Sequence, residues 1–328
     1  MKIKALAMLS GGLDSRLAAK LILDQGIDVV AINFTSPFCM CNQKGKCVSA
    51  DAAKQLNIPL KTIPKGEEYI KVIRKPKYGY GSGVNPCLDC RIFTLKKAKN
   101  YAKKIGAKFI FTGEVYDQRP MSQRAKAMKI IERDSGLEGK LLRPLSAKLL
   151  PETEAEKKGW VDRKKLLGMK GRTRRPQISL AKRFGLVDYP CPSGGCLLTY
   201  KEFAKKARDL FSHKKTISLM DMKLLKYGRH FRSGENKIIV GRRESENKAL
   251  LSLKFPGDYV FEVPDCGSPI TLLQGEKIKK AIELAASLTA RYSDAKGKVI
   301  EVKYGKIKPT RRIQVPPVKK RKIEELRV

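Results

Sequence analysis

The sequence has no hydrophobic run long enough to cross a membrane. Its N-terminal apolar run, Ala5 to Leu9, ends at a Ser-Gly-Gly turn. That is far short of the roughly 20 residues that a spanning helix needs, and too short for a secretory leader. We therefore expect a cytoplasmic protein with no membrane contact. Thiols stay reduced in the cytoplasm, so the eight cysteines are expected to bind metal or carry redox chemistry rather than form structural disulfides.

Acidic residues are scarce relative to basic ones. The 328 residues include 70 Lys and Arg against 32 Asp and Glu, which gives a formal net charge of +38. Such a charge is costly in a compact chain unless a polyanion uses it, so nucleic acid is the expected partner. A generally basic composition is the alternative. Histidine is also rare, and neither His213 nor His230 is expected to be a catalyst.

The sequence has no internal repeat, and apolar runs alternate with helical patterns over its first third. Residues 3–8 and 29–34 are short apolar runs, with an amphipathic stretch over 17–23 between them. This order predicts a strand–helix–strand unit with parallel strands. A helix over 88–105 and a buried strand over 109–112 continue the pattern. We therefore expect an α/β fold with a doubly wound parallel sheet.

The character of the sequence changes after residue 115. Residues 115–200 carry helical and irregular patterns with cysteines and many basic residues, and short strand patterns follow from about 215. We expect a catalytic domain over 1–200 that includes this 115–200 extension. A smaller α+β domain over 201–305 and a basic C-terminal tail over 306–328 complete the predicted organisation. The tail is expected to be either a flexible arm or a final strand with an arm.

The sharpest motif is a Ser-Gly-Gly-Leu-Asp-Ser loop between the first strand and the first helix. Two glycines let the backbone approach an anion, the serines supply hydroxyl donors, and the helix N-terminus supplies unpaired N–H groups. Asp14 can hold Mg²⁺ or cap the helix. A Gly-x-x-x-x-Gly-Lys-Ser/Thr loop is absent from the sequence, and a Gly-rich turn without a ligand is the alternative. The loop comprises Ser10, Gly11, Gly12, Leu13, Asp14 and Ser15.

Two cysteine pairs lie where turns could bring thiols together. Cys87 and Cys90 form a Cys-x-x-Cys pair at a loop–helix junction, where the helix dipole favours thiolates. Cys191 and Cys196 flank a Gly-Gly turn. Such pairs bind zinc, bind an iron–sulfur cluster, or act as a redox pair. A third group receives no assigned role: Cys39, Cys41 and Cys47.

The loop over residues 10–15 resembles the signature loop of the PP-loop ATP pyrophosphatases. Members of this superfamily cleave ATP between the α- and β-phosphates and transfer AMP to a carbonyl oxygen. The resemblance implies that ATP and Mg²⁺ bind at this loop. The further positions that it places beside ATP are Asn33, Phe34, Gly113 and Glu114.

The run Asn85–Arg91 resembles the cysteine motif of the PP-loop tRNA thiolases, which include 2-thiouridylases, 4-thiouridine synthetases and 2-thiocytidine synthetases. The resemblance implies a [4Fe-4S] cluster held by Cys87, Cys90 and a distant cysteine followed by Pro. Cys191 matches that third position best. Cys196 is the competing ligand or a sulfur-carrying nucleophile. A four-thiolate zinc site and a persulfide route without a cluster stay open.

Two arginine-containing blocks, Gln118–Arg124 and Leu142–Leu145, also resemble segments of a thiolase-like subfamily. Arginine grips phosphate with two parallel hydrogen bonds. We therefore expect Arg119 and Arg143 to contact ATP or RNA. Ordinary salt bridging is the alternative.

Residues 221–248 resemble the RNA-binding domain of the NFACT ribosome-quality-control proteins, through Gly228–Phe231, Val240–Arg242 and the pair at 246–247. Basic residues surround an expected hairpin turn at Ser233–Asn236, beside aromatic side chains able to stack on bases. A basic domain that only braces the catalytic one is the alternative. The residues expected to bind RNA are Tyr227, Arg229, His230, Phe231, Arg232, Arg242 and Arg243.

Together these resemblances imply ATP-dependent thiolation of a tRNA uridine, with Asp14, Cys87 and Cys196 as catalytic residues. The implied partners are tRNA and a sulfur donor, either sulfide or a cysteine desulfurase or sulfur carrier, and the protein would act as a monomer or homodimer. No rhodanese-like or N-terminal RNA-capture domain is recognisable, so the target nucleotide and the donor stay open. The alternatives are a PP-loop ligase or amidotransferase-like enzyme for a small carbonyl substrate, and a non-catalytic ribosome-associated RNA-binding factor.

Overall fold

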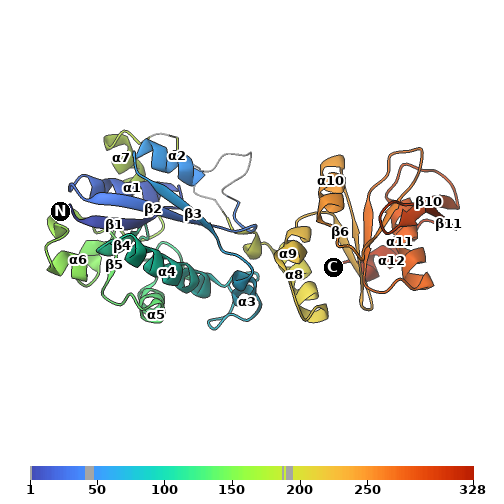
Figure 1. Cartoon of the computed structure of the whole chain (residues 1–328), viewed down its shortest axis with the longest axis horizontal. Helices are drawn as coiled ribbons and strands as arrows, with labels where there is room; N and C mark the ends of the chain where they lie inside the picture. Colours follow the sequence, from blue (N-terminus) through green and yellow to red (C-terminus); the bar gives the residue numbers. More distant parts are fainter. Residues whose placement is uncertain (1, 41–47, 187, 190–194) are drawn as a thin grey trace. The chain divides into compact units, whose positions relative to one another are not determined.

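The computed structural model describes residues 2–40, 48–186, 188–189 and 195–328. The chain divides into two compact units, Met1–Tyr200 and Lys201–Val328 (Figure 1). Within the described residues, no helix is both long and apolar enough to span a bilayer.

The first unit is built on a parallel five-stranded sheet with the order β3-β2-β1-β4-β5. The central strand β1 is almost completely buried, because helices cover both faces of a parallel sheet. In register, Ala5 lies between Val29 of β2 and Phe109 of β4. The strands are β1 (Lys4–Met8), β2 (Asp28–Thr35), β3 (Leu60–Pro64), β4 (Phe109–Thr112) and β5 (Leu141–Leu142).

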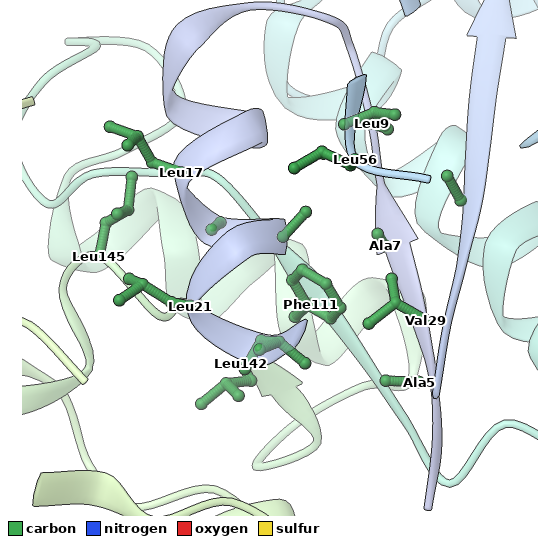
Figure 2. Packing of buried hydrophobic residues seen from close by; sticks show 14 of the residues in the cluster. Ala5, Ala7, Leu9, Leu17, Leu21, Val29, Leu56, Phe111, Leu142 and Leu145 are labelled. Atoms are coloured by element: carbon green, nitrogen blue, oxygen red, sulfur yellow. The ribbon is translucent and has the colours of Figure 1, made fainter. Parts of the chain in front are cut away.

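Helices cover both faces of this sheet, with α1, α2 and α7 on one side and α4 and α5 on the other (Figure 1). Figure 2 shows Leu21 of α1 and Phe111 of β4 in the core between α1 and the sheet. The predicted doubly wound α/β fold is therefore confirmed. The helices are α1 (Leu13–Leu23), α2 (Val48–Gln55), α3 (Glu68–Arg74), α4 (Cys87–Lys104), α5 (Ala125–Ser135), α6 (Glu154–Lys157) and α7 (Arg175–Arg183).

The second unit is built on an antiparallel six-stranded sheet with the order β11-β10-β8-β9-β7-β6. The predicted hairpin is confirmed, because β6 and β7 pair up to Ser233 and Asn236 across a two-residue turn in which Gly234 has a φ of +55°. The strands are β6 (Arg229–Ser233), β7 (Asn236–Val240), β8 (Tyr259–Glu262), β9 (Thr271–Gln274), β10 (Ile300–Gly305) and β11 (Arg311–Val315).

Two hydrophobic clusters cover the two faces of this second sheet. One contains side chains of α11 and α12, and the other contains side chains of α9 and α10. The helices are α8 (Lys201–His213), α9 (Leu219–Leu224), α10 (Glu244–Leu253), α11 (Lys279–Arg291) and α12 (Lys320–Leu326).

The segment 306–328, expected as a basic tail, forms β11 and α12 within the second unit. β11 pairs with β10 over its whole length, and Ile323 of α12 is buried. The backbone N–H of Val328 donates to the carbonyl of His230 at 3.0 Å. Of the two expected alternatives, the final strand is present as β11, in which alternate side chains such as Ile313 and Val315 face the core. The residues after it form α12 rather than a free arm.

Candidate active site

The Ser10–Ser15 loop, called the phosphate loop below after its expected ligand, opens onto a cavity of about 720 Å³ in the first unit. The loop follows the carboxyl end of β1, and α1 begins at Leu13. In open α/β sheets such ends are where ligands bind. An adjoining pocket of about 150 Å³ is lined by Asn33 and Phe34 at the end of β2. The predicted positions that line the large cavity include Ser10, Gly12, Leu13, Asp14, Ser15, Gly113, Glu114 and Arg119.

Close backbone packing explains two of the glycines at this site. Gly11 has a φ of +81°, and a Cβ there would lie 2.5 Å from the carbonyl of Val48. A Cβ on Gly113 would lie 2.5 Å from the N–H nitrogen of Ser15. Gly12 differs, because its Cβ would meet only the Ser10 hydroxyl oxygen, at 3.5 Å. The missing side chain of Gly12 thus leaves open the space in front of the N-terminus of α1.

Three side chains hold the backbone of this loop. The Arg16 Nε donates to the carbonyl of Gly11 at 2.9 Å, and its Nη1 donates to Gln55 of α2 at 2.6 Å. Arg16 is only 2% exposed. The Asn33 Nδ2 donates to the carbonyl of Leu9 at 2.8 Å, and the Ser15 hydroxyl donates to the carbonyl of Gly12 at 2.8 Å. The loop is therefore preformed, and its N–H groups are not used by these contacts.

Asp14 has the surroundings of a cation ligand. Its side chain lines the cavity, and its Oδ1 is buried without a hydrogen bond to any described residue. Burial raises the pKa of Asp14 above its ordinary value, although Arg174, whose Nη2 lies 4.0 Å from Oδ2, opposes this. A carboxylate that lines a nucleotide-sized cavity and has one unpartnered oxygen fits Mg²⁺, which prefers oxygen ligands.

Glu114 is the centre of a buried ion-pair network at the cavity wall. Its Oε1 accepts hydrogen bonds from Arg91 at 2.6 and 2.8 Å, and its Oε2 accepts one from Arg143 at 2.9 Å. Burial alone would raise the pKa of Glu114, but the two guanidinium groups lower it to about 2. Both carboxylate oxygens are thus occupied, and Glu114 orients Arg91, which itself lines the cavity.

Arg143 does not contact the cavity. Its side chain is 3% exposed, and it is paired with both Glu114 and Glu132. The expectation that Arg143 contacts ATP or RNA is therefore wrong, because a guanidinium enclosed by two carboxylates cannot reach a phosphate. Arg119 instead lines the cavity and forms no ion pair with a described carboxylate. Burial, together with the charges of Arg91 and Arg174, lowers the pKa of Arg119.

Three of the predicted cysteines line the same cavity. Cys87 begins α4, Cys90 lies one turn later, and Cys196 comes from the segment before α8. The Asn85 Nδ2 lies 3.1 Å from the Cys87 Sγ, and the Lys65 Nζ lies 3.0 Å from the Cys90 Sγ. The thiols therefore face the space beside the phosphate loop.

Burial disfavours the thiolate form of Cys87 and Cys196. Burial, and then the nearby Cys90, raises the pKa of Cys87, although the Asn85 hydrogen bond lowers it. Burial raises the pKa of Cys196 to about 11. No set of three or more metal-ligating side chains is found within the described ranges. Cys191, like Cys41 and Cys47, lies outside them, so the ligand set stays a prediction.

Sequence reasoning assigned no role to three cations of the cavity, Lys65, Arg91 and Arg174. Lys65 directly follows β3, and its ammonium lies 4.4 Å from the ring centroid of Tyr69. Arg174 is the N-cap of α7, which packs on α1. The position of Lys65 at the carboxyl end of a parallel strand was a usable signal. Nothing local in the sequence marks Arg174.

Most residues expected to bind RNA have structural roles in the second unit. Phe231 is fully buried and His230 is 1% exposed, so neither can stack on a base. Phe231 packs in the core with α11, because it occupies a strand position that faces that helix. Burial, and then the positive charges of Lys237 and Lys206, lowers the pKa of His230 well below its ordinary value. The expectation that these two residues contact RNA is therefore wrong.

The arginines of this motif differ in whether their side chains are held by contacts within the second unit. Arg232 donates to both oxygens of Asp209, at 2.8 and 2.7 Å, and Arg242 forms an ion pair with the buried Glu246 at 2.5 Å. Arg229 lies over the ring of Tyr292, with its guanidinium carbon 4.4 Å from the ring centroid. Tyr227 is half-buried against the cluster that contains α9 and α10. Arg243 is exposed, and it is not part of any described ion pair.

Both units match known families. Residues 1–148 match the family model described as thiamine biosynthesis protein (ThiI), and residues 228–327 match the NFACT protein RNA binding domain. A tRNA-specific 2-thiouridylase of Leptospira biflexa is 32% identical over 127 residues, which cover 34% of this chain and 33% of that protein. The chain thus spans about a third of that relative's length.

Longer but weaker similarities extend over more of the chain. The tRNA-specific 2-thiouridylase of Rippkaea orientalis is 26% identical over 258 residues, 74% of this chain and 68% of that protein. A solved 4-thiouridine synthetase in complex with RNA and ATP is 18% identical with a TM-score of 0.39, over 67% of this chain and 52% of that chain. The two family matches thus fall in different units, the thiamine biosynthesis protein (ThiI) model in the first and the NFACT RNA-binding model in the second.

Proposed function

We propose that this protein uses ATP and Mg²⁺ to activate a uridine carbonyl of tRNA and then replaces the carbonyl oxygen with sulfur. The observation that carries the proposal is a single cavity that contains both the phosphate loop and the thiols of Cys87, Cys90 and Cys196. Thiols beside a nucleotide site have no role in simple adenylation, whereas sulfur transfer needs both.

In the first half-reaction the uracil oxygen attacks the α-phosphorus of ATP and pyrophosphate leaves. The N–H groups at the start of α1 would stabilise the developing phosphate charge. Arg119 and Arg174 would hold the polyphosphate, and Asp14 would hold Mg²⁺ through its unpartnered oxygen. Asn33 and Phe34 would lie beside the adenine in the adjoining pocket.

In the second half-reaction a sulfur nucleophile attacks the activated carbon of the base and AMP leaves. The donor chemistry of the thiols fits a [4Fe-4S] cluster bound by Cys87, Cys90 and either Cys191 or Cys196, with zinc as the alternative. Such a cluster, when bound, supplies an iron that accepts sulfide. A persulfide on Cys196 is the route without a cluster. Sulfide would supply the cluster route, whereas a persulfide on Cys196 needs sulfane sulfur transferred from a cysteine desulfurase or a sulfur carrier.

The second unit would supply the affinity for tRNA, through its basic surface and its NFACT-type fold. The net charge of +38 agrees with a polyanionic substrate. We place the activity in the cytoplasm, with a monomer or homodimer as the active species.

The test combines metal analysis with a thiolation assay. The protein is purified anaerobically, and iron, acid-labile sulfide and zinc are measured per chain. It is then incubated with tRNA, ATP, Mg²⁺ and sulfide, and the digested nucleosides are examined for thiouridine by mass spectrometry. About four iron and four sulfide per chain would support the cluster. Zinc without iron would indicate that the thiols either have a structural role or act through the persulfide route.

Matched variants decide the role of the cavity. Asp14→Asn and Cys87→Ser are expected to abolish thiolation while tRNA binding persists. Asp24→Asn, at the C-terminus of the same helix, and Cys266→Ser, an exposed thiol of the second unit, are the controls and should keep full activity. Thiolation retained in Asp14→Asn would overturn the proposal. ATP turnover that needs no RNA would favour a ligase for a small carbonyl compound.

A further inference from the structure

Two cysteines from distant parts of the chain face each other across a β-bridge. Cys39 follows β2, Cys196 precedes α8, and they form an isolated antiparallel bridge. The Met40 N–H donates to the Gly195 carbonyl at 3.2 Å, and the Leu197 N–H donates to the Phe38 carbonyl at 2.9 Å. These hydrogen bonds flank the two cysteines rather than join them, so Cys39 and Cys196 are a non-hydrogen-bonded pair.

Such a pair has the geometry that a disulfide requires. Directly opposed residues of this type have Cα atoms about 4.5 Å apart, with their side chains on the same face. Disulfides span Cα distances of about 4.4–6.8 Å. The neighbours Phe38 and Leu198 are fully buried, so the two segments are anchored in this register. Both cysteines line the large cavity.

We propose that Cys39 and Cys196 are a dithiol pair that closes a disulfide by thiol–disulfide exchange. One thiol first carries a sulfur adduct, which is a mixed disulfide or a persulfide delivered by a sulfur donor. The thiolate of the other cysteine attacks the protein-bound sulfur, and the adduct's S–S bond breaks. The leaving thiolate or hydrosulfide takes the electron pair, and the attacking cysteine is oxidised. An external dithiol then reduces the Cys39–Cys196 disulfide and is itself oxidised.

This pair assigns a role to a cysteine outside the family motif. If Cys196 carries a persulfide, attack by Cys39 releases hydrosulfide into the cavity that contains Cys87, Cys90 and the phosphate loop. That consequence rests on the proposed function. Formation of the disulfide does not, because it requires no ATP and no RNA, so failure of one can be told apart from failure of the other.

The test uses oxidised glutathione as the disulfide probe on the reduced full-length protein. After quenching, intact mass gives the number of glutathione adducts, and peptides digested without reduction give the linked cysteines. The expected product is a Cys39–Cys196 disulfide with no glutathione retained on either residue. In Cys39→Ser, glutathione should stay on Cys196, and in Cys196→Ser it should stay on Cys39, with about tenfold more retained adduct because the intramolecular attack is lost.

Neighbouring cysteines provide the controls. Each linked tryptic peptide contains two cysteines, so Cys41→Ser and Cys191→Ser are needed, and both should form the linked peptide as the wild type does. Cys39→Ala serves as a second substitution that adds no hydroxyl. Linkage of Cys196 to Cys87 or Cys90 would overturn the proposal. Glutathione retained on both Cys39 and Cys196 of the wild type would also overturn it.

Discussion

The two units each carry a recognisable motif, yet the motif residues behave differently. In the first unit the loop over residues 10–15 and the Cys-x-x-Cys pair face a cavity. In the second unit the residues around Gly228–Phe231 form the core, a hairpin and two ion pairs. A short motif therefore marks a binding surface only where the fold leaves its polar groups open, and elsewhere it describes the fold itself.

Both units also place an acidic residue against two cations. Glu114 lies between Arg91 and Arg143, and Asp209 lies against Arg232 and Lys237. The first arrangement directs an arginine toward the cavity, whereas the second ties α8 to the β6–β7 hairpin. The same chemistry thus positions a functional group in one unit and stabilises packing in the other.

The largest effect is expected from Glu114→Gln. It removes the carboxylate that Arg91 and Arg143 share and leaves Arg143 with Glu132 as its ion-pair partner among the described residues. We expect a loss of about 3–5 kcal/mol in the free energy of unfolding of the first unit. The single tryptophan, Trp160, packs in that unit, so its fluorescence during urea unfolding reports the change. The exposed Glu138→Gln is the control and should leave the transition unchanged.

Phe231→Ala should lower the free energy of unfolding of the second unit by a similar amount, and it should do so without removing a contact to RNA. Removing a fully buried phenyl ring costs about 3–5 kcal/mol. Circular dichroism should show an earlier unfolding transition, while the Trp160 transition stays in place. If instead stability is unchanged and tRNA binding is lost, Phe231 contacts RNA and the contrast between the units fails.

A smaller, pH-dependent effect is expected at Asp209. Burial opposes ionisation, but hydrogen bonds and charges from Arg232 and Lys237 lower the pKa of Asp209 to about 2. A lowered pKa contributes stability above the ordinary value of 3.8, and this contribution is lost as the pH falls toward 2. Asp209→Asn should therefore cost about 2 kcal/mol at pH 7 and flatten the acid dependence of the second transition. If the stability of Asp209→Asn fell with decreasing pH as steeply as that of the wild type, the prediction would be contradicted. Glu244→Gln, at an exposed position, is the control.

The smallest effect is expected from Arg243→Ala. Arg243 is exposed, so its loss should not change unfolding. tRNA binding should weaken by about two- to fivefold. The slope of log Kd against the logarithm of the salt concentration should decrease by about one, which corresponds to the loss of one phosphate contact. Filter binding at several salt concentrations measures both. Arg243→Lys should keep the charge and most of the affinity, and unchanged binding in Arg243→Ala would move the RNA surface elsewhere.

The sequence was sufficient for the sheet and the phosphate loop, because hydrophobic alternation and a strand–Gly-Gly–helix order are local signals. The sequence also predicted a shared site for Cys87, Cys90, Cys191 and Cys196. Three of these cysteines line one cavity, and Cys191 lies outside the described residues. The sequence could not predict that Arg143 is enclosed by Glu114 and Glu132, since both partners come from other elements. Nor could it separate buried from exposed members of the 227–243 segment, because that depends on which sheet face α11 covers.

Arg16 has a consequence for the thermodynamics of nucleotide binding. Its guanidinium donates a hydrogen bond to the carbonyl of Gly11, and the Asn33 amide donates one to the carbonyl of Leu9 at the end of β1. The loop is ordered before any ligand binds. The free energy of ATP binding is therefore not reduced by the entropic cost of ordering the loop. Titration calorimetry should accordingly show a small entropic penalty in the wild type, and Arg16→Met should enlarge that penalty more than it changes the enthalpy.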